Sequence, residues 1–281
     1  MKIIQTAAEF AQWRYAQTET IGFIPTLGAL HKGHLSLVLL SKQTCKLTVV
    51  SIFLNPAQFA PEEDLNSYPS TLDDDINMLK NVAVDILFLP STKEMYNKVG
   101  DVKVPHTPLF DKLEGASRPH FFYGVTTIVA KLFNVIKPTH AFFGQKDAQQ
   151  LYIIKQMITK MSFHIHLIAG STIRNQQGLA LSSRNQYLTI RQQKKASIIY
   201  SGLMHIKDAL DRGQKNPRVL KRSYQTMLNK IEEIKIDYIS IACINTLDEV
   251  EIIETSKLLI STAVLYHNVR LVDNFIYQSS T

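Results

Sequence analysis

The chain has 281 residues, of which 45% are hydrophobic and 20% charged, as expected for a globular protein with a sizeable core. Its first residues turn polar within five positions and no apolar run approaches the length of a bilayer span, so we expect neither a signal peptide nor a membrane segment. The net charge of +7 is concentrated at residues 191–222, where nine Lys and Arg accompany two acids and one aromatic residue, a pattern more typical of solvated helices than of a nucleic-acid surface.

The first half of the chain alternates short apolar strands with helices. We expect strands at 3–4, 21–24, 46–54 and 84–89, and helices at 6–17 and 72–81. Segment 46–54 is β-branched and apolar almost throughout, which is typical of a parallel strand covered on both faces. This alternation predicts an α/β fold with a doubly wound parallel sheet.

The pattern continues up to a change near residue 175. Apolar residues at helical spacing predict a helix over 125–136 that ends before Pro138, followed by strand 140–143, helix 151–161 and strand 164–169. Beyond this point we expect two basic helices and strands at 236–244, 258–265 and 269–272. The sequence thus predicts a Rossmann-like domain at 1–175 and a smaller C-terminal α+β lid domain at 176–281.

The segment Ile21–His34 combines a buried strand, a turn with a proline and two glycines, and the start of a helix. Free backbone N–H groups and the helix dipole make such a turn a site for anions. His31 and His34 can add directed hydrogen bonds and can exchange a proton near neutral pH. The alternative is an ordinary strand–turn–helix connection with two surface histidines.

Further polar loops follow predicted strands at 55–61 and 144–147, and another lies at 181–185. They offer amides, a lysine with an acid, and two hydroxyls with a guanidinium. In open α/β sheets, ligands bind beyond the carboxyl ends of the strands, so these loops suit one polyphosphate ligand. Neither a Walker A motif nor GxGxxG occurs, so the sequence predicts a different phosphate-binding device.

His31–His34 is an HxGH motif, and Leu181–Arg184 looks like a short counterpart of the KMSKS loop. This pair resembles the HxGH nucleotidyltransferase superfamily. The blocks PTLGALHKGH, VSIFLNPAQF, EDLNSYPST, EMY, LEGASR, FGQKDAQQ and GLALSSRNQY occur in the order found in the pantothenate synthetase (pantoate–β-alanine ligase) family, and the VRLVDN ending at 269–274 is also similar.

The resemblance implies an ATP-dependent ligase of coenzyme A biosynthesis. In that family, ATP and (R)-pantoate form pantoyl adenylate and pyrophosphate, and β-alanine then displaces AMP. His34 is implied as proton donor, with His31 and Lys146 on the phosphates. The implied ATP-binding residues are Leu27, Gly28, Ala29, Leu30, His31, Lys32, Gly33, His34, Gly144, Gln145, Lys146, Asp147, Ile173, Leu181, Ser182, Ser183 and Arg184.

The resemblance also implies that Gln58 contacts pantoate and β-alanine and that Gln150 contacts pantoate. Asp74 and Asp75 match acids near Mg²⁺ in the family, although acids in a first helical turn also stabilise a helix by themselves. Arg118 matches an arginine that contacts phosphate or the other subunit. A homodimer is likewise implied.

The chain departs from the family pattern at RPGHF, where it has Arg118-Pro119-His120-Phe121-Phe122. A nucleotidyltransferase that stops at an adenylated product is one alternative function, although the NPAQF and KDAQQ blocks favour the ligase. An RNA-binding protein, suggested by the basic segment alone, is another. Two distant cysteines, Cys45 and Cys243, indicate neither a disulfide framework nor a zinc site and suit the cytoplasm.

Overall fold

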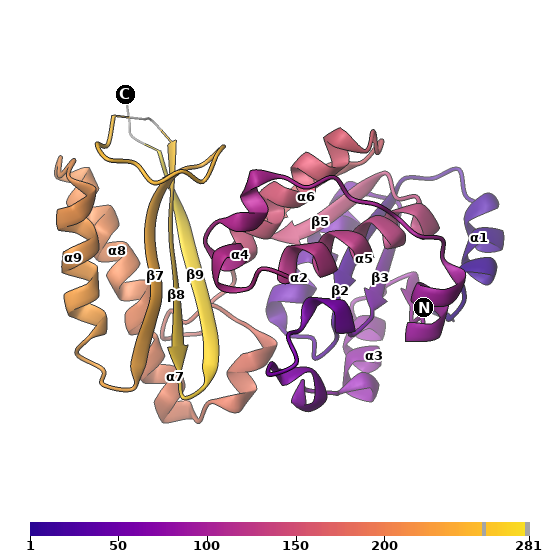
Figure 1. Cartoon of the computed structure of the whole chain (residues 1–281). Coiled ribbons are helices and arrows are strands. Elements are labelled where there is room, and N and C mark those ends of the chain that lie inside the picture. The colour runs from indigo at the N-terminus through magenta and orange to yellow at the C-terminus, as the bar shows by residue number, and fades with distance from the viewer. Residues whose placement is uncertain (255–256, 279–281) are drawn as a thin grey trace.

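The computed structural model describes residues 1–254 and 257–278. Two sheets lie beside each other, and helices pack against each of them (Figure 1). The larger sheet is parallel and has the strand order β1-β4-β3-β2-β5-β6. Its strands are β1 (Lys2–Ile4), β2 (Ile21–Thr26), β3 (Leu47–Ile52), β4 (Ile86–Phe88), β5 (His140–Gly144) and β6 (His166–Gly170). The predicted doubly wound parallel sheet is confirmed.

The strand order places a switch point beside β2. From β2 the chain builds outward through β3 and β4, whereas β5 returns to the other side of β2 and is followed by β6. Because the connections from the central strands lead away to opposite sides of β2, a crevice forms at the carboxyl ends of these strands. The loops after β2, β3 and β5 therefore converge at one place.

Helices cover both faces of this sheet. They are α1 (Ala7–Tyr15), α2 (Lys32–Thr44), α3 (Leu72–Asn81), α5 (Phe121–Ile136) and α6 (Ala148–Lys160), whereas the one-turn helix α4 (Glu114–Ser117) packs against α5. Along β2, Ile21 and Phe23 join the core with α1, α5 and α6, whereas Ile24 joins the core with α2 and α3. Strand residues that alternate between two apolar cores explain why these strands read as continuous apolar runs.

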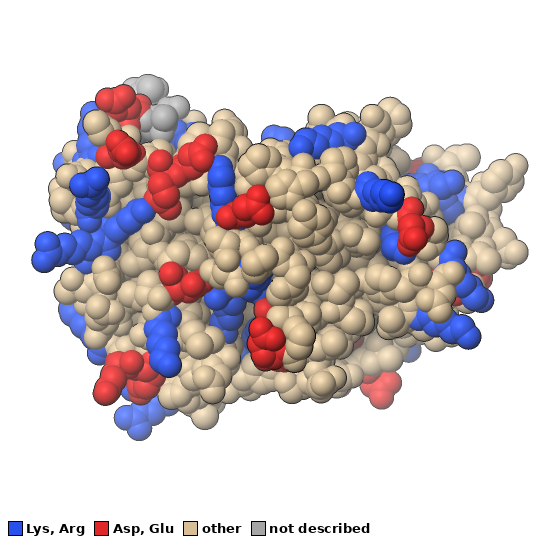
Figure 2. Space-filling view, viewed as in Figure 1, with Lys and Arg blue, Asp and Glu red and all other residues tan. Residues whose placement is uncertain are grey.

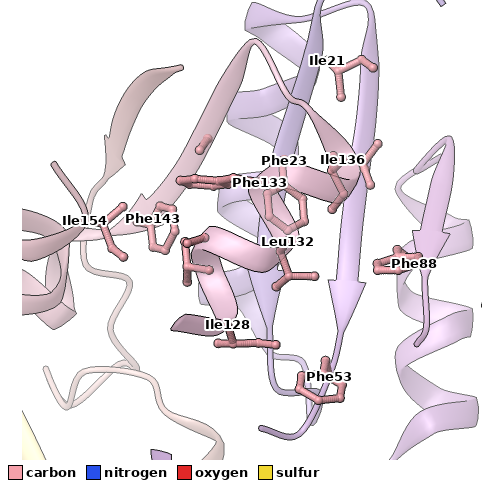
Figure 3. Packing of buried hydrophobic residues seen from close by; sticks show 14 of the residues in the cluster. Ile21, Phe23, Phe53, Phe88, Ile128, Leu132, Phe133, Ile136, Phe143 and Ile154 are labelled. Carbon is pink, nitrogen blue, oxygen red and sulfur yellow. The ribbon is translucent and has the colours of Figure 1, made fainter. Parts of the chain in front are cut away.

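Helix α5 supplies much of the larger core. Ile128, Leu132, Phe133 and Ile136 project from it towards Phe23 and neighbouring strand residues (Figure 3). The ring centroids of Phe23 and Phe133 lie 6.3 Å apart in an edge-to-face arrangement. This packing fixes α5 against the sheet next to the loop that follows β3.

The smaller sheet is antiparallel and consists of β7 (Ile234–Cys243), β8 (Lys257–Tyr266) and β9 (Val269–Gln278). Three helices precede it rather than the predicted two: α7 (Ile190–Ala196), α8 (Ile198–Asp211) and α9 (Pro217–Leu228). The first basic helix is divided at Ser197, which ends α7 before α8 begins. Strand β9 extends six residues beyond the predicted end at 272, because it pairs with β8 along its whole length.

Basic and acidic side chains are interspersed at the end of the molecule where α8 and α9 lie (Figure 2). Three lysines of the basic segment form ion pairs, Lys195 with Glu233, Lys207 with Asp211 and Lys221 with Glu249. Part of the positive charge counted in the sequence is therefore locally balanced. Within residues 1–254 and 257–278, no helix has both the length and the apolar character that crossing a bilayer requires.

Candidate active site

A buried carboxylate shapes the turn between β2 and α2. Asp75 of α3 accepts the backbone N–H groups of Ala29 and Leu30, each at 2.8 Å, and the hydroxyl of Thr71 at 3.1 Å. The backbone of Gly28 and Ala29 has φ angles of 91° and 49° there, a conformation that costs a non-glycine residue energy. A charged acceptor with two short hydrogen bonds stabilises this conformation.

The turn is held from the other side by the second half of the chain. The Ser183 hydroxyl donates to the carbonyl oxygen of Ala29 at 2.9 Å. Ser183 is buried and belongs to the predicted phosphate loop at 181–184. The two loops that the HxGH and KMSKS-like motifs identified are thus in direct contact.

The two histidines cap helix α2 and stack on each other. Nδ1 of His31 accepts the N–H of Gly33 at 3.1 Å, and Nδ1 of His34 accepts the N–H of His31 at 3.3 Å. Their ring centroids are 4.0 Å apart. A Cβ atom on residue 33 would lie 2.8 Å from Cε1 of His31, so glycine is required for the rings to sit this close to the helix. The spacing of the HxGH motif therefore places both imidazole rings and the glycine in contact at the start of α2.

Both imidazoles are held in the neutral form. Burial, and after it the positive charge of Lys146, lowers the pKa of His31 from 6.5 to about 4. Burial lowers the pKa of His34 well below its ordinary value, and repulsion from His31, when that ring is protonated, and from Lys146 acts in the same direction. A neutral ring that accepts through Nδ1 carries its proton on Nε2. Each histidine therefore keeps an N–H donor for a ligand.

The loop after β5 brings Lys146 to the same place. Its Nζ lies 3.2 Å from a carboxylate oxygen of Asp147, and its side chain is 19% exposed. Nδ2 of Asn274 in β9 donates to the carbonyl oxygens of Gln145 and Lys146 at 3.1 and 2.7 Å. The smaller sheet thereby positions the lysine loop, which gives a physical role to the VRLVDN ending.

Two arginines near the site are already paired with acids. Arg184 makes two hydrogen bonds to the carboxylate of Asp64, at 2.8 and 2.9 Å. Burial alone would raise the pKa of Asp64. The hydrogen bonds and the charge of Arg184 outweigh this effect and hold the pKa of Asp64 below its usual value. Arg118 binds Glu63 in the same bidentate way and covers the ring of Phe121 at 3.9 Å. Phe121, which departs from the family pattern, thus supports an arginine.

Two neighbouring cavities share several lining residues, among them Arg118 and Arg184. A pocket of about 240 Å³ is lined by both histidines, and a cleft of about 590 Å³ is lined by residues from both halves of the chain. The predicted residues that line the pocket are Leu27, His31, Gly33, His34, Gln58, Gly144, Lys146, Asp147, Gln150, Ile173, Leu181, Ser182, Ser183 and Arg184. Gln150 and Lys146 line both spaces. The structure therefore brings most of the predicted ATP and pantoate residues around one pocket.

Several predicted residues lie outside these linings. Gly28, Ala29 and Leu30 form the turn behind the pocket, and Lys32 is exposed at the start of α2. The side-chain amide of Gln145 donates to Asn274 and does not line either cavity. These five residues therefore do not line the pocket or the cleft.

The two predicted metal ligands do not share a site. Asp74 is exposed, whereas Asp75 is 1% exposed and uses both carboxylate oxygens on backbone N–H groups. Among the described residues, no group of three or more His, Cys, Asp or Glu side chains is arranged to hold a metal ion. The contacts of Asp75 fit a role in shaping the turn and do not fit direct coordination of Mg²⁺.

Sequence reasoning did not single out Asp64, Asn274 or Asn55, although all three belong to blocks that resembled the family. Asp64 binds Arg184, Asn274 holds the lysine loop, and Asn55 contacts Gln58. Their presence in EDLNSYPST, VRLVDN and NPAQF was the available signal. What they bind could not be inferred, because each contact joins loops from different elements.

Comparison with known proteins gives a consistent family. The family model described as pantoate-beta-alanine ligase matches residues 2–276. A pantothenate synthetase from Caldicellulosiruptor bescii is 41% identical over 276 residues, which cover 98% of each chain. One from Thermosipho africanus is 42% identical over 279 residues, 98% of this chain and 100% of the relative.

Solved structures agree with this result over nearly the whole chain. A pantothenate synthetase from Thermus thermophilus superposes with a TM-score of 0.91 at 36% identity and covers 98% of this chain and 99% of its own. A pantoate-beta-alanine ligase from Francisella tularensis, solved with beta-gamma ATP and beta-alanine, has a TM-score of 0.77 at 33% identity and covers 98% and 97%.

Proposed function

Because the chain belongs to the pantoate–β-alanine ligase family, we propose that the pocket and the adjoining cleft, which share lining residues, bind ATP, pantoate and β-alanine. The enzyme is an ATP-dependent ligase that forms pantothenate through a pantoyl adenylate and releases AMP and pyrophosphate. The observation that carries the assignment of the site is the meeting of His31, His34, Lys146 and Gln58 around one pocket.

In the first step, a carboxylate oxygen of pantoate attacks the α-phosphorus of ATP, and the bond to the pyrophosphate oxygen breaks. Negative charge grows on the leaving pyrophosphate. Four groups that line the pocket can donate hydrogen bonds to this charge: the Nε2–H groups of His31 and His34, the ammonium of Lys146 and the hydroxyl of Ser182. Donors that are already oriented stabilise the transition state without reorganisation of solvent.

In the second step, the amine of β-alanine attacks the acyl carbon, the C–O bond to AMP breaks, and the amine proton is released. Gln58 and Gln150 line the pocket as neutral groups that hold a hydroxy-acid without adding charge. The relative from Francisella tularensis was solved in complex with beta-gamma ATP and beta-alanine, which supports both substrates sharing one site.

The two half-reactions give a direct test. Exchange of labelled pyrophosphate into ATP is expected to require pantoate, because the reversible step forms the pantoyl adenylate. AMP is expected to accumulate only after β-alanine is added. Exchange that proceeds equally well without pantoate would contradict the proposed site and reaction and would favour a different adenylated acceptor.

We propose that Mg²⁺ arrives with ATP. Mg²⁺ usually binds substrate phosphates and keeps several waters, so it does not need a complete set of protein ligands. Its charge would offset that of the phosphates. Both carboxylate oxygens of Asp75 accept backbone N–H groups of residues 29 and 30, so Asp75 would hold the turn rather than the metal.

This assignment predicts different outcomes for two neighbouring aspartates. Asp75→Asn replaces a carboxylate oxygen by an amino group facing a backbone N–H, so the free energy of unfolding in urea is expected to fall by about 2 kcal/mol. Pyrophosphate exchange should fall about tenfold or more as the turn loses its shape. The control Asp74→Asn changes an exposed side chain and should alter stability by less than about 0.5 kcal/mol.

The dependence of exchange on Mg²⁺ separates the two possible roles of Asp75. If Asp75 shapes the turn, the Mg²⁺ concentration for half-maximal exchange stays near the wild-type value in Asp75→Asn. A large increase in that concentration, with unchanged stability, would instead show that Asp75 is a metal ligand.

We also propose a cytoplasmic homodimer. Both cysteines of the described chain are free, which suits a reducing compartment, and the family resemblance implies the dimer. Light scattering after size-exclusion chromatography would give about twice the 31.9 kDa of one chain.

A further inference from the structure

The orientation of the Gln58 amide is set by a chain of hydrogen bonds that begins outside the pocket. Asn55, at the end of the loop from β3, is fully buried and lies between Gln58, Gly124 of α5 and Tyr96. An amide has one donor end and one acceptor end, so its neighbours decide which way it points.

Two backbone groups fix the orientation of Asn55. The carbonyl oxygen of Gly124 can only accept, and it lies 3.1 Å from Nδ2. The N–H of Ala57 can only donate, and it lies 3.4 Å from Oδ1. Helix α5 can lie this close to the loop at Asn55–Gln58 because residue 124 is glycine. A Cβ atom there would lie 2.2 Å from the carbonyl oxygen of Ala57.

With Asn55 so oriented, the next amide follows. The second hydrogen on Nδ2 of Asn55 points to Gln58 at 3.2 Å, so the atom that receives it is the acceptor Oε1. The amino group of Gln58, at the other end of its amide, then serves the pocket that Gln58 lines. In this orientation Gln58 can donate a hydrogen bond to a ligand in the pocket.

Tyr96 lies at the other end of this series of hydrogen bonds. Its hydroxyl donates to Oδ1 of Asn55 at 2.5 Å. Burial raises the pKa of Tyr96, so the hydroxyl keeps its proton near neutral pH. Tyr96 lies in the short π-helix Glu94–Lys98. The buried Lys131 of α5 ties this turn down through the carbonyl oxygens of Met95 and Val99, at 3.0 and 3.2 Å.

We propose that Tyr96 is a positioning residue for the acid substrate, which acts through Asn55 to hold the Gln58 amide with its amino group facing the pocket. The inference rests on the proposed binding of pantoate there. It specifies that Gln58 meets an acceptor oxygen of that ligand, a carboxylate or hydroxyl lone pair, rather than a donor.

The test uses the full-length enzyme and the variant Tyr96→Phe, which removes only the hydroxyl. We expect the KM for pantoate in pyrophosphate exchange to rise about three- to tenfold, the effect of one weakened hydrogen bond. The KM for ATP should stay within about twofold. The matched control is Tyr224→Phe, which removes a buried hydroxyl bonded to the carbonyl oxygen of Ile199 in the other core. It should lower thermal stability without changing the KM for pantoate.

A double-mutant cycle shows whether Tyr96 acts through Gln58. In a Gln58→Ala background, Tyr96→Phe is expected to cause no further rise in the KM for pantoate, because the amide that it orients is gone. Independent effects that multiply would overturn the inference, as would a normal KM for pantoate in Tyr96→Phe or in Gln58→Ala. Failure of the proposed function has a different signature, namely wild-type exchange that does not depend on pantoate.

Discussion

Replacement of His34 by alanine is expected to lower pantoate-dependent pyrophosphate exchange by about 10²- to 10³-fold. The ring is neutral, because burial lowers its pKa well below the ordinary value, and its Nδ1 is used by the N–H of His31. Its Nε2–H is thus free to act as the donor that we propose for the phosphate oxygens on which charge develops. The variant removes this donor from the lining of the pocket.

The fold should survive this change. Loss of a helix cap typically costs about 1 kcal/mol, which is a small part of the stability of a domain. Circular dichroism and thermal unfolding would check this, and His34→Asn, whose amide can still accept the N–H of His31, serves as a second variant. The control is His166→Ala, an exposed histidine at the start of β6. Exchange within about threefold of wild type in His34→Ala would remove His34 from the mechanism.

Replacement of Lys146 by methionine is expected to reduce exchange to a similar extent, about 10²-fold or more. Methionine keeps most of the side-chain volume but removes the ammonium that we propose binds the phosphates. Because Asn274 binds the backbone carbonyls of residues 145 and 146, the loop should keep its position when the side chain changes. The KM for ATP should rise, and the maximal rate should fall more, since the charge matters most in the transition state.

The matched control is Lys155→Met, at an exposed position of α6, the helix that follows the Lys146 loop. It should leave both kinetic constants near the wild-type values. A second readout comes from His31, since the charge of Lys146 contributes to its low pKa of about 4. In Lys146→Met the His31 pKa, measured by NMR, should move up towards 6.5. An unchanged rate in Lys146→Met would mean that the phosphates bind elsewhere.

The local patterns of the sequence predicted the elements of the larger sheet well. Apolar β-branched runs gave β3, and helical spacing gave α5, although α5 begins at Phe121, four residues before the predicted start. The prediction missed the first turn of α5 for a physical reason. No side chain caps this helix, and His120 at its N-cap already has helical backbone angles. Local signals that depend on a capping residue cannot locate such an end.

The second half of the chain was less predictable. The last strand was expected to end at 272, but Phe275, Ile276 and Tyr277 continue it. Their partners are residues 258–260 of β8, and pairing of this kind depends on the neighbouring strand more than on intrinsic preference. The division of the first basic helix at Ser197 likewise has no strong signal of the glycine or proline type.

By itself, the sequence determined the fold class, the family and the chemical groups of the site. These depend on periodicity and on short contiguous motifs such as HxGH, whose residues are neighbours in space because they are neighbours in the chain. Only the tertiary structure decided how these groups are held. Asp75 shapes a turn 45 and 46 residues away, Arg184 is paired with an acid 120 residues away, and Tyr96 acts on an amide 41 residues away. Hydrogen bonds between distant segments leave no periodic trace in the sequence, because they arise only when packing of the sheet and helices brings the loops together.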